Sequence, residues 1–323
     1  MSPNSWTCLH PSNATETMLS LDNRGLAYGD GFFTTMGVID GQILWLDYHQ
    51  QRLTSHATAL HLQLDSQLLL AMLKTHAKQL QQGMLKLIAT RAEQEVRGYG
   101  YTPNIGGSAC EIWLKSSPMA ITTAQSLPLA NNQFIPLQPA ASAICLSSQI
   151  ACLPPMLAGL KSLNRLDNVL ASGELHAIKA QAIEAKTWQD NIKPSIAEGL
   201  LRDMSGRWVE GTMSNVFYQL LEAPAAKSSN SPHSQNNSNS NSNYLTQGQW
   251  YTPSMAQSGV AGVMRQVIID TLSTSNNPVI IRSLQDEDLP HLSQLFFCNA
   301  LRGIMPMSSL RLLSGEVVSF EAI

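Results

Sequence analysis

Charged residues are scarce in this chain of 323 residues, because Asp, Glu, Lys and Arg together make up only 13% of it, well under the usual share of roughly 25%. The formal net charge is −3, which excludes the strongly basic character of a general nucleic-acid or anionic-membrane binder. No apolar run approaches the ~20 residues of a membrane-spanning helix. The first residues show neither the basic start nor the apolar segment of a secretory signal. We therefore expect a cytoplasmic protein that binds neither nucleic acid nor membrane.

Cysteine is also rare and shows no pattern. The chain has five cysteines with no CxxC spacing among them, namely Cys8, Cys110, Cys145, Cys152 and Cys298. An odd, scattered set excludes a disulfide framework and a zinc site and predicts reduced thiols. The eight histidines have no metal-ligand spacing either. We expect no metal site.

The first third of the chain predicts a small α+β domain, residues 1–125. Asp40-Gly41 lies between two apolar runs, which is a strong signal for a β-hairpin with a two-residue turn. Residues 48–82 predict one or two helices, and residues 84–91 and 111–117 alternate like strands. Prolines without sustained periodicity follow, so residues 126–141 are predicted to be an inter-domain connection.

Residues 142–323 predict a second, larger and β-rich α/β domain. Residues 163–179 read as a helix with Leu163, Leu166, Val169, Leu170 and Ala177 on its apolar face, and residues 262–272 read as another. The Ser/Asn-rich tract 223–245 cannot bury apolar surface and is predicted to be a disordered loop. Strands are predicted over residues 142–151, 207–220, 249–254, 278–284 and 292–307.

Lys161 is the first candidate for chemistry, since apolar and small residues surround it in "LAGLKSLNRLDNVLA" (residues 157–171). A lysine before a helix is most often a solvated helix-end residue. In an apolar pocket, however, burial penalises the ammonium, lowers its pKa and yields an amine nucleophile. Such an amine forms a Schiff base with carbonyl compounds, including pyridoxal 5'-phosphate.

That cofactor needs three further groups, and the chain offers a candidate for each. A carboxylate must face the pyridine nitrogen, and Glu210 is the one acid in an otherwise apolar strand. A helix N-terminus binds phosphate, and Gly259 and Gly262 precede a helical run. An arginine adds bidentate charge, and Arg52 lies near a helix start. Each also has an ordinary structural explanation, and spacing alone does not bring them together.

The order of motifs along the chain resembles the class IV aminotransferases, the fold-type IV pyridoxal-phosphate enzymes. This group includes branched-chain and D-amino-acid aminotransferases and aminodeoxychorismate lyases. The matching motifs are "RGLAYGDGFFTT", "HQQRL", "LKSLNRLDNVLA", "VEGTMSNVFY", "YTPSMAQSGVAGVMRQ" and "CNALRGIMP". The resemblance implies the two-domain fold of this group, pyridoxal 5'-phosphate as cofactor, and a homodimer in which the small domain of one subunit approaches the other's site.

The resemblance also implies roles for individual residues. Lys161 is implied to form the Schiff base, Glu210 to pair with the pyridinium nitrogen, and Arg52 to bind the phosphate. The remaining implied cofactor ligands are the backbone N–H groups of Val263 and Met264, Ala300 after Asn299, and Asn215 as a supporting polar residue.

Within the family, three stretches resemble the lyase: residues 157–171, "RGYGY" (residues 97–101) and "CNALRGIMP". That likeness implies β-elimination of 4-amino-4-deoxychorismate to 4-aminobenzoate and pyruvate, a step of folate biosynthesis. "EGTMSNVF" is equally similar to D-amino-acid aminotransferases, so a D- or branched-chain amino-acid aminotransferase stays open as an alternative. A further alternative is a non-catalytic binding module on the same fold, although such a module would not need all four groups.

The lyase substrate is a small dianion, so cationic and hydroxyl groups should bind it. Arg97 is the first candidate and Arg91 the second, and Thr34, Tyr99 and Tyr101 could donate hydrogen bonds. Each of these could equally be an ordinary strand residue. The chain departs from the family pattern at Asn23, where aspartate is usual, and in two insertions, residues 183–196 and 223–245.

Overall fold

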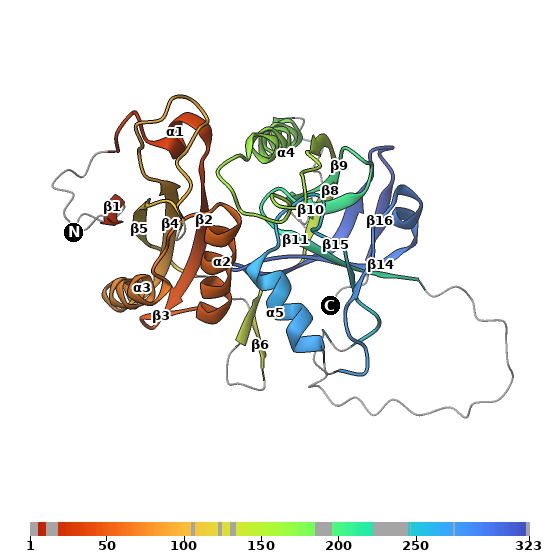
Figure 1. Ribbon diagram of the computed structural model, residues 1–323. Helices are drawn as coiled ribbons and strands as arrows, with labels where there is room; N and C mark the ends of the chain where they lie inside the picture. Colours follow the sequence, from red (N-terminus) through yellow and green to blue (C-terminus); the bar gives the residue numbers. More distant parts are fainter. Residues whose placement is uncertain are drawn as a thin grey trace, which may run out of the picture.

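The computed structural model describes residues 6–10, 19–104, 107–121, 125–129, 134–184, 196–221, 245, 247–273 and 275–320. Two sheets dominate it (Figure 1). The first has five strands in the order β1-β5-β4-β2-β3. Its strands are β1 (Trp6–His10), β2 (Gly31–Ile39), β3 (Gln42–Ile43), β4 (Gly83–Arg91) and β5 (Cys110–Pro118).

The predicted hairpin is confirmed in β2 and β3. Asp40 and Gly41 both have positive φ, 50° and 70°, as the two-residue turn that matches strand twist requires. Residues 48–82 form two helices, α2 (Leu46–Ala59) and α3 (Ser66–Leu80). A short helix, α1 (Arg24–Tyr28), is capped by the Asn23 side chain, which accepts from the N–H groups of Gly25 and Leu26.

The two faces of the first sheet differ. Phe32, Met36 and the alternate β4 residues Leu85 and Leu87 are fully buried in one core with α2 and α3. Phe33 and its same-face neighbours point to the opposite face, because successive strand residues alternate. That second face is the one that meets Lys161.

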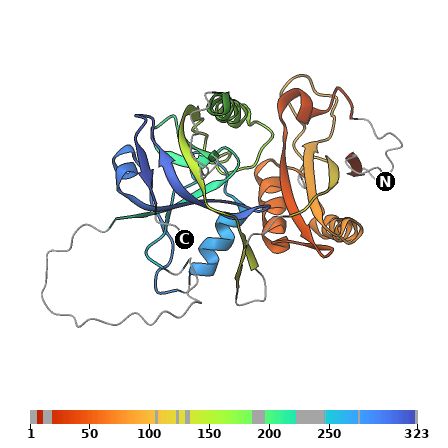
Figure 2. The same cartoon turned by 180° about the vertical axis from the view of Figure 1, so that it is seen from behind.

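The second sheet has eleven strands and lies beside the first (Figures 1 and 2). Helices α4 (Leu166–Glu184) and α5 (Val263–Leu272) lie on opposite sides of it, and α2 contacts α5. A 3-10 helix, η2 (Asp286–His291), precedes β14. The strands are β6 (Gln125–Pro128), β7 (Phe134–Leu137), β8 (Ala141–Ile150), β9 (Ile196–Asp203), β10 (Trp208–Gly211), β11 (Asn215–Leu220), β12 (Tyr251–Thr252), β13 (Ile280–Ile281), β14 (Leu292–Asn299), β15 (Gly303–Arg311) and β16 (Val317–Ser319).

The stretch predicted as an irregular connection contains two strands. β6 and β7 pair antiparallel, and β7 runs parallel to β15 in the second sheet. Ile135 is fully buried there, which holds the segment to the sheet. Pro128 is tolerated because β6 is an edge strand, where a missing N–H is not needed. The predicted single strand 207–220 is likewise split, by a turn at residues 212–214, into β10 and β11.

The helix predicted over residues 163–179 exists, but its predicted apolar face is wrong. Leu166, Val169 and Leu170 are 77%, 61% and 70% exposed, while Ala171 and Leu175 are buried. Periodicity identified the helix without telling which apolar stripe meets the sheet. The Ser/Asn tract, apart from Leu245, and most of the 183–196 insertion lie outside the described residues. In the part of the chain that is described, no helix is long and apolar enough to cross a membrane.

Candidate active site

Lys161 lies in the loop between β8 and α4, and neighbouring elements hold its backbone on both sides. Its N–H donates to Nε2 of His56 on α2 (2.9 Å), and its carbonyl accepts from the N–H of Phe33 on β2 (3.0 Å). Its Nζ lies 4.6 Å from the centroid of the Phe33 ring. The ammonium therefore sits between the two sheets, against an aromatic face.

Burial lowers the pKa of Lys161 to about 8. The positive charge of Arg52 contributes to this lowering, while the carboxylate of Glu210 opposes it. About a tenth of the side chain is then the neutral amine at pH 7, and about half at pH 8. The neutral amine is the form that attacks a carbonyl. The burial and the lowered pKa agree with the environment expected of Lys161 from the sequence, and its role as the Schiff-base lysine stays a prediction.

Glu210 lies on β10 and is buried, with both carboxylate oxygens occupied. Oε2 accepts from the N–H of Val260 (2.8 Å), and Oε1 accepts from Nδ2 of Asn168 (3.3 Å). Burial raises the pKa of Glu210, and these hydrogen bonds with the charges of Arg165 and Lys161 act in the opposite direction. The structure thus brings a buried acid and a buried amine into one electrostatic site.

The N-terminus of α5 supplies an uncapped anion site beside Arg52. The cap residue is Gly262, and no described side chain caps the N–H groups that follow, those of Val263 and Met264. Arg52 is buried on α2, and its Nη2 donates to the Ala261 carbonyl (2.7 Å) at this helix start. Burial lowers the pKa of Arg52 to about 10, so it stays cationic at neutral pH. A phosphate group fits such donors.

Asn215 acts on the same helix start through its side chain. Nδ2 donates to the carbonyl of Val260 (2.8 Å). A Cβ on Gly262 would come within 1.9 Å of Oδ1 of Asn215, so only glycine fits this approach. Ala300 lies in the turn after β14, where Oδ1 of Asn299 accepts from the N–H groups of Leu301 (3.1 Å) and Arg302 (2.8 Å).

Of the predicted substrate ligands, Arg91, Tyr99 and Tyr101 line a cavity of about 320 Å³ that also includes Ser162, the residue after Lys161. Arg91 is buried and donates to Asp30 (2.9 Å) and to the Leu60 carbonyl (2.7 Å), and its guanidinium lies 4.0 Å from the centre of the Tyr101 ring. That guanidinium therefore connects the end of β4 to Asp30, which precedes β2, and to Leu60, which follows α2. Arg97 is exposed and Tyr99 is 86% exposed, on the loop that follows β4.

Thr34 points away from Lys161. Its Oγ1 is buried on the helix side of the sheet, 2.9 Å from Nδ1 of His49. The neighbouring Thr35 lies on the same face as Phe33, by strand alternation. On β2, the threonine on the face that meets Lys161 is therefore Thr35 and not Thr34, the residue predicted from the sequence.

Sequence reasoning missed His56, Asn168 and Val260, which contact Lys161 or Glu210. Burial lowers the pKa of His56 to about 3, with Arg52 and Lys161 adding to the shift, so its ring is neutral. Asn168 could have been found, because it lies at the start of the helix that follows Lys161. No motif or periodicity around His56 or Val260 predicts these contacts.

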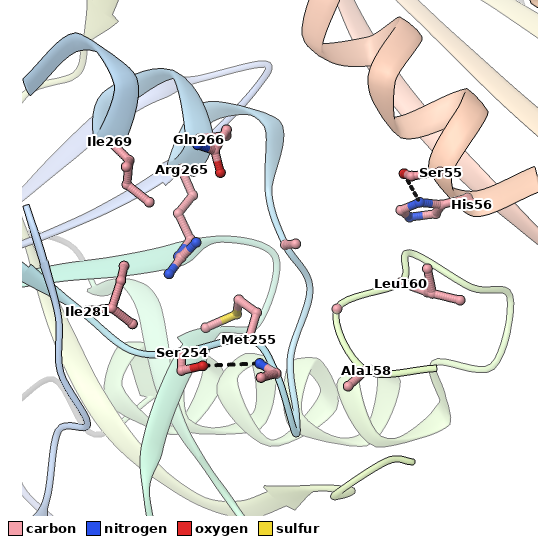
Figure 3. A pocket seen from close by; sticks show the side chains of 13 residues that line it. Ser55, His56, Ala158, Leu160, Ser254, Met255, Arg265, Gln266, Ile269 and Ile281 are labelled. Atoms are coloured by element: carbon pink, nitrogen blue, oxygen red, sulfur yellow. Dashed lines mark hydrogen bonds between the residues drawn. The ribbon is translucent and has the colours of Figure 1, made fainter. Parts of the chain in front are cut away.

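A cavity of about 540 Å³ lies next to this site. Figure 3 shows Ser55 and His56 on one side of it and Arg265, Gln266 and Ile269 of α5 on another. Its lining includes neither Lys161, Glu210 nor Arg52. The cavity therefore lies beside the Lys161 site and holds none of the three side chains predicted to bind the cofactor.

The family model for amino-transferase class IV matches residues 31–310. The chain belongs to that family. Class IV enzymes use pyridoxal 5'-phosphate, which confirms the predicted cofactor. One structural neighbour, a hypothetical aminotransferase from Mycobacterium tuberculosis, was solved in a PLP-bound form. The Lys161 site suits this group, since it combines an amine of lowered pKa, a buried carboxylate and an uncapped helix N-terminus with an arginine.

Several class IV proteins are similar over most of this chain. A 4-amino-4-deoxychorismate lyase structure from Pseudomonas aeruginosa is 30% identical with a TM-score of 0.66, covering 94% of this chain and 90% of that one. An aminodeoxychorismate lyase from Vibrio harveyi is 23% identical, covering 91% and 88%. A branched-chain amino acid aminotransferase structure from Escherichia coli is 18% identical with a TM-score of 0.61, covering 91% and 80%, which shows the fold alone. The predicted fold class is confirmed.

Proposed function

We propose that this class IV enzyme is an aminodeoxychorismate lyase, which converts 4-amino-4-deoxychorismate to 4-aminobenzoate and pyruvate in folate biosynthesis. The observation that carries the choice within the family is the 30% identity to the Pseudomonas aeruginosa lyase over 94% of this chain. The Lys161 site supports it, because β-elimination needs one amine that can both remove and return a proton.

The cofactor would be held by residues already described. Lys161 would form the covalent link, Glu210 would face the pyridine nitrogen, and Arg52 would bind the phosphate. The N–H groups of Val263 and Met264 and the backbone at Ala300 would complete the phosphate site, with Asn215 holding the helix start. When bound, pyridoxal 5'-phosphate supplies an electron sink that stabilises negative charge on the substrate carbon bearing the amine.

The chain's own contribution is proton movement and positioning. Nζ of Lys161 takes the proton from the carbon that bears the substrate amine. The bond between the neighbouring ring carbon and the enolpyruvyl oxygen then breaks, and Nζ returns a proton to the leaving group, which becomes pyruvate. The ring left behind is aromatic, so no oxidant or reductant is needed. Glu210, whose carboxylate accepts from the N–H of Val260 and the Asn168 amide, would favour a protonated pyridine nitrogen.

The rival within the family is an aminotransferase for D- or branched-chain amino acids. It is favoured by a putative branched-chain-amino-acid aminotransferase from Methanocaldococcus jannaschii, 25% identical and covering 95% of this chain and 87% of that protein. Lyase turnover releases 4-aminobenzoate and pyruvate without added 2-oxo acid. An enzyme that transfers amino groups to 2-oxo acids and releases no 4-aminobenzoate from 4-amino-4-deoxychorismate would overturn the proposal.

We also propose that the chain works as a cytoplasmic homodimer of two-domain subunits, with residues 1–125 and 142–323 as the domains. The exposed Leu166, Val169 and Leu170 lie at i, i+3 and i+4 on α4, one apolar stripe that a second copy would cover. Light scattering tests the dimer, because Leu170→Arg should dissociate it while the unchanged protein stays dimeric.

Arg97 and Tyr99 are exposed at the end of the first sheet. In the proposed dimer they reach the substrate bound by the partner subunit.

A further inference from the structure

The face of the first sheet that meets Lys161 carries two lysines side by side. Thr35, Lys86 and Lys115 are direct neighbours in register across β2, β4 and β5. Strand alternation puts all three on the Phe33 face, since Leu85 and Leu87 on either side of Lys86 are fully buried in the opposite core. A hydroxyl and two ammonium groups therefore form one row across the sheet.

Lys86 lies close to the reacting amine. Its Nζ is 5.2 Å from the centroid of the Phe33 ring, and Nζ of Lys161 is 4.6 Å from the same centroid. The two nitrogens are thus separated by no more than these two distances together. The charge of Lys86 also contributes to the lowered pKa of Lys161.

These lysines lack a counter-charge in the described part of the chain. No ion pair there includes Lys86 or Lys115. Like charges directly opposite each other on neighbouring strands destabilise a sheet. An anionic ligand beside Lys161 would relieve that repulsion, and it would be attracted to a positive face before it binds.

We propose that Lys86 binds the ring carboxylate of the substrate and thereby orients its amine toward Lys161. This inference rests on the proposed lyase function. The substrate amine and ring carboxylate lie at opposite ends of a six-membered ring, and the enolpyruvyl group is next to the amine. With the amine at Lys161, the ring carboxylate is the anionic group that reaches away from it, across Phe33 to Lys86. Lys115 strengthens the positive field and Thr35 lies next to the bound carboxylate.

The test uses the holoenzyme and two probes that differ by this carboxylate. 4-Aminobenzoate retains the ring carboxylate, and aniline lacks it. Lys86→Met should weaken inhibition by 4-aminobenzoate about tenfold or more, the effect of losing a charge-assisted hydrogen bond, and leave aniline binding unchanged. The KM for 4-amino-4-deoxychorismate should rise by a similar factor. Lys86→Arg should restore part of both effects.

Lys74→Met is the matched control, because Lys74 is an exposed lysine of α3 and the charge change is the same. It should behave as the unchanged protein. The absorbance of bound cofactor reports whether Lys86→Met is folded. If that variant does not fold, Lys86→Gln replaces it in the same measurements. Equal 4-aminobenzoate inhibition in Lys86→Met and the unchanged protein would overturn the inference alone, as would equal weakening of both probes. An unchanged protein without lyase turnover would overturn the proposed function and this inference with it.

Discussion

The backbone N–H of Lys161 donates to Nε2 of His56, which ties the candidate catalytic loop to helix α2. Because Nε2 accepts, the neutral ring carries its proton on Nδ1, 3.2 Å from Oγ of Ser55. The Ser55 hydroxyl in turn donates to the Arg52 carbonyl (3.2 Å). A continuous series of hydrogen bonds therefore connects the backbone of Arg52 to the backbone of Lys161 through Ser55 and His56.

Acid should destabilise the protein through His56. Its pKa is about 3 in the folded protein against an ordinary value of 6.5, so the unfolded state binds the proton first. The contribution to stability is fully present above pH 6.5 and is lost as pH falls from there toward 3. Urea unfolding at pH 7.5 and pH 5 should show a smaller acid loss for His56→Asn than for the unchanged protein. Equal losses would mean that His56 is not the group responsible.

Incorporation of the cofactor into the apoprotein should depend on pH through Lys161. Its pKa is about 8, and only the neutral amine attacks. The rate of pyridoxal 5'-phosphate incorporation, followed by absorbance, should rise with pH through about 8 and level off above it. A rate that still climbs steadily through pH 10 would indicate an ordinary, solvated lysine.

Removing the charge of Glu210 should reduce turnover more than folding. Glu210→Gln keeps the shape but loses the carboxylate that favours a protonated pyridine nitrogen, and electrostatic groups of this kind contribute roughly 10²–10³ in kcat. Stability should be maintained, because a buried carboxylate is itself expensive to desolvate. The control is Glu316→Gln, at an exposed glutamate. Turnover of Glu210→Gln within a factor of about three of the unchanged enzyme would contradict the assigned role.

Glycine at position 262 should be required for the α5 N-terminus. In Gly262→Ala the new Cβ would meet Oδ1 of Asn215 at 1.9 Å, so the helix start must shift, at about 1–3 kcal/mol of stability. Cofactor affinity should fall as well. Gly173→Ala on α4 is the matched control, because a Cβ there meets no atom within 4 Å, and alanine in a helix is favoured by roughly 0.5–1 kcal/mol. Comparable thermal midpoints and cofactor affinities for the two variants would refute the steric account.

Local patterns predicted the local structure of this chain well. The Asp40-Gly41 turn, the two helices after it and α5 follow from short-range periodicity and turn chemistry. The same patterns could not tell which side of an element faces the core. The exposed stripe of α4 and the choice between Thr34 and Thr35 both depend on packing against another element.

Contacts between distant residues were beyond the sequence pattern. Lys161 and Glu210 were linked by resemblance to a family, since their spacing does not bring them together. Arg91 was predicted as a substrate ligand, and its contact with Asp30, a residue 61 positions earlier, could not be seen from the sequence. The sequence did not indicate Lys86 as a site residue, because only the register of β2, β4 and β5 places it beside Thr35 and Lys115.

The central claim is that Lys161 carries the cofactor, and borohydride reduction tests it most directly. The purified holoenzyme should show a visible absorbance band that is lost on reduction, and peptide mapping should find the pyridoxyl group on Lys161. Lys161→Ala should carry no reducible adduct. A stable pyridoxyl group on another lysine, such as Lys86, or an unchanged adduct in Lys161→Ala, would contradict the account.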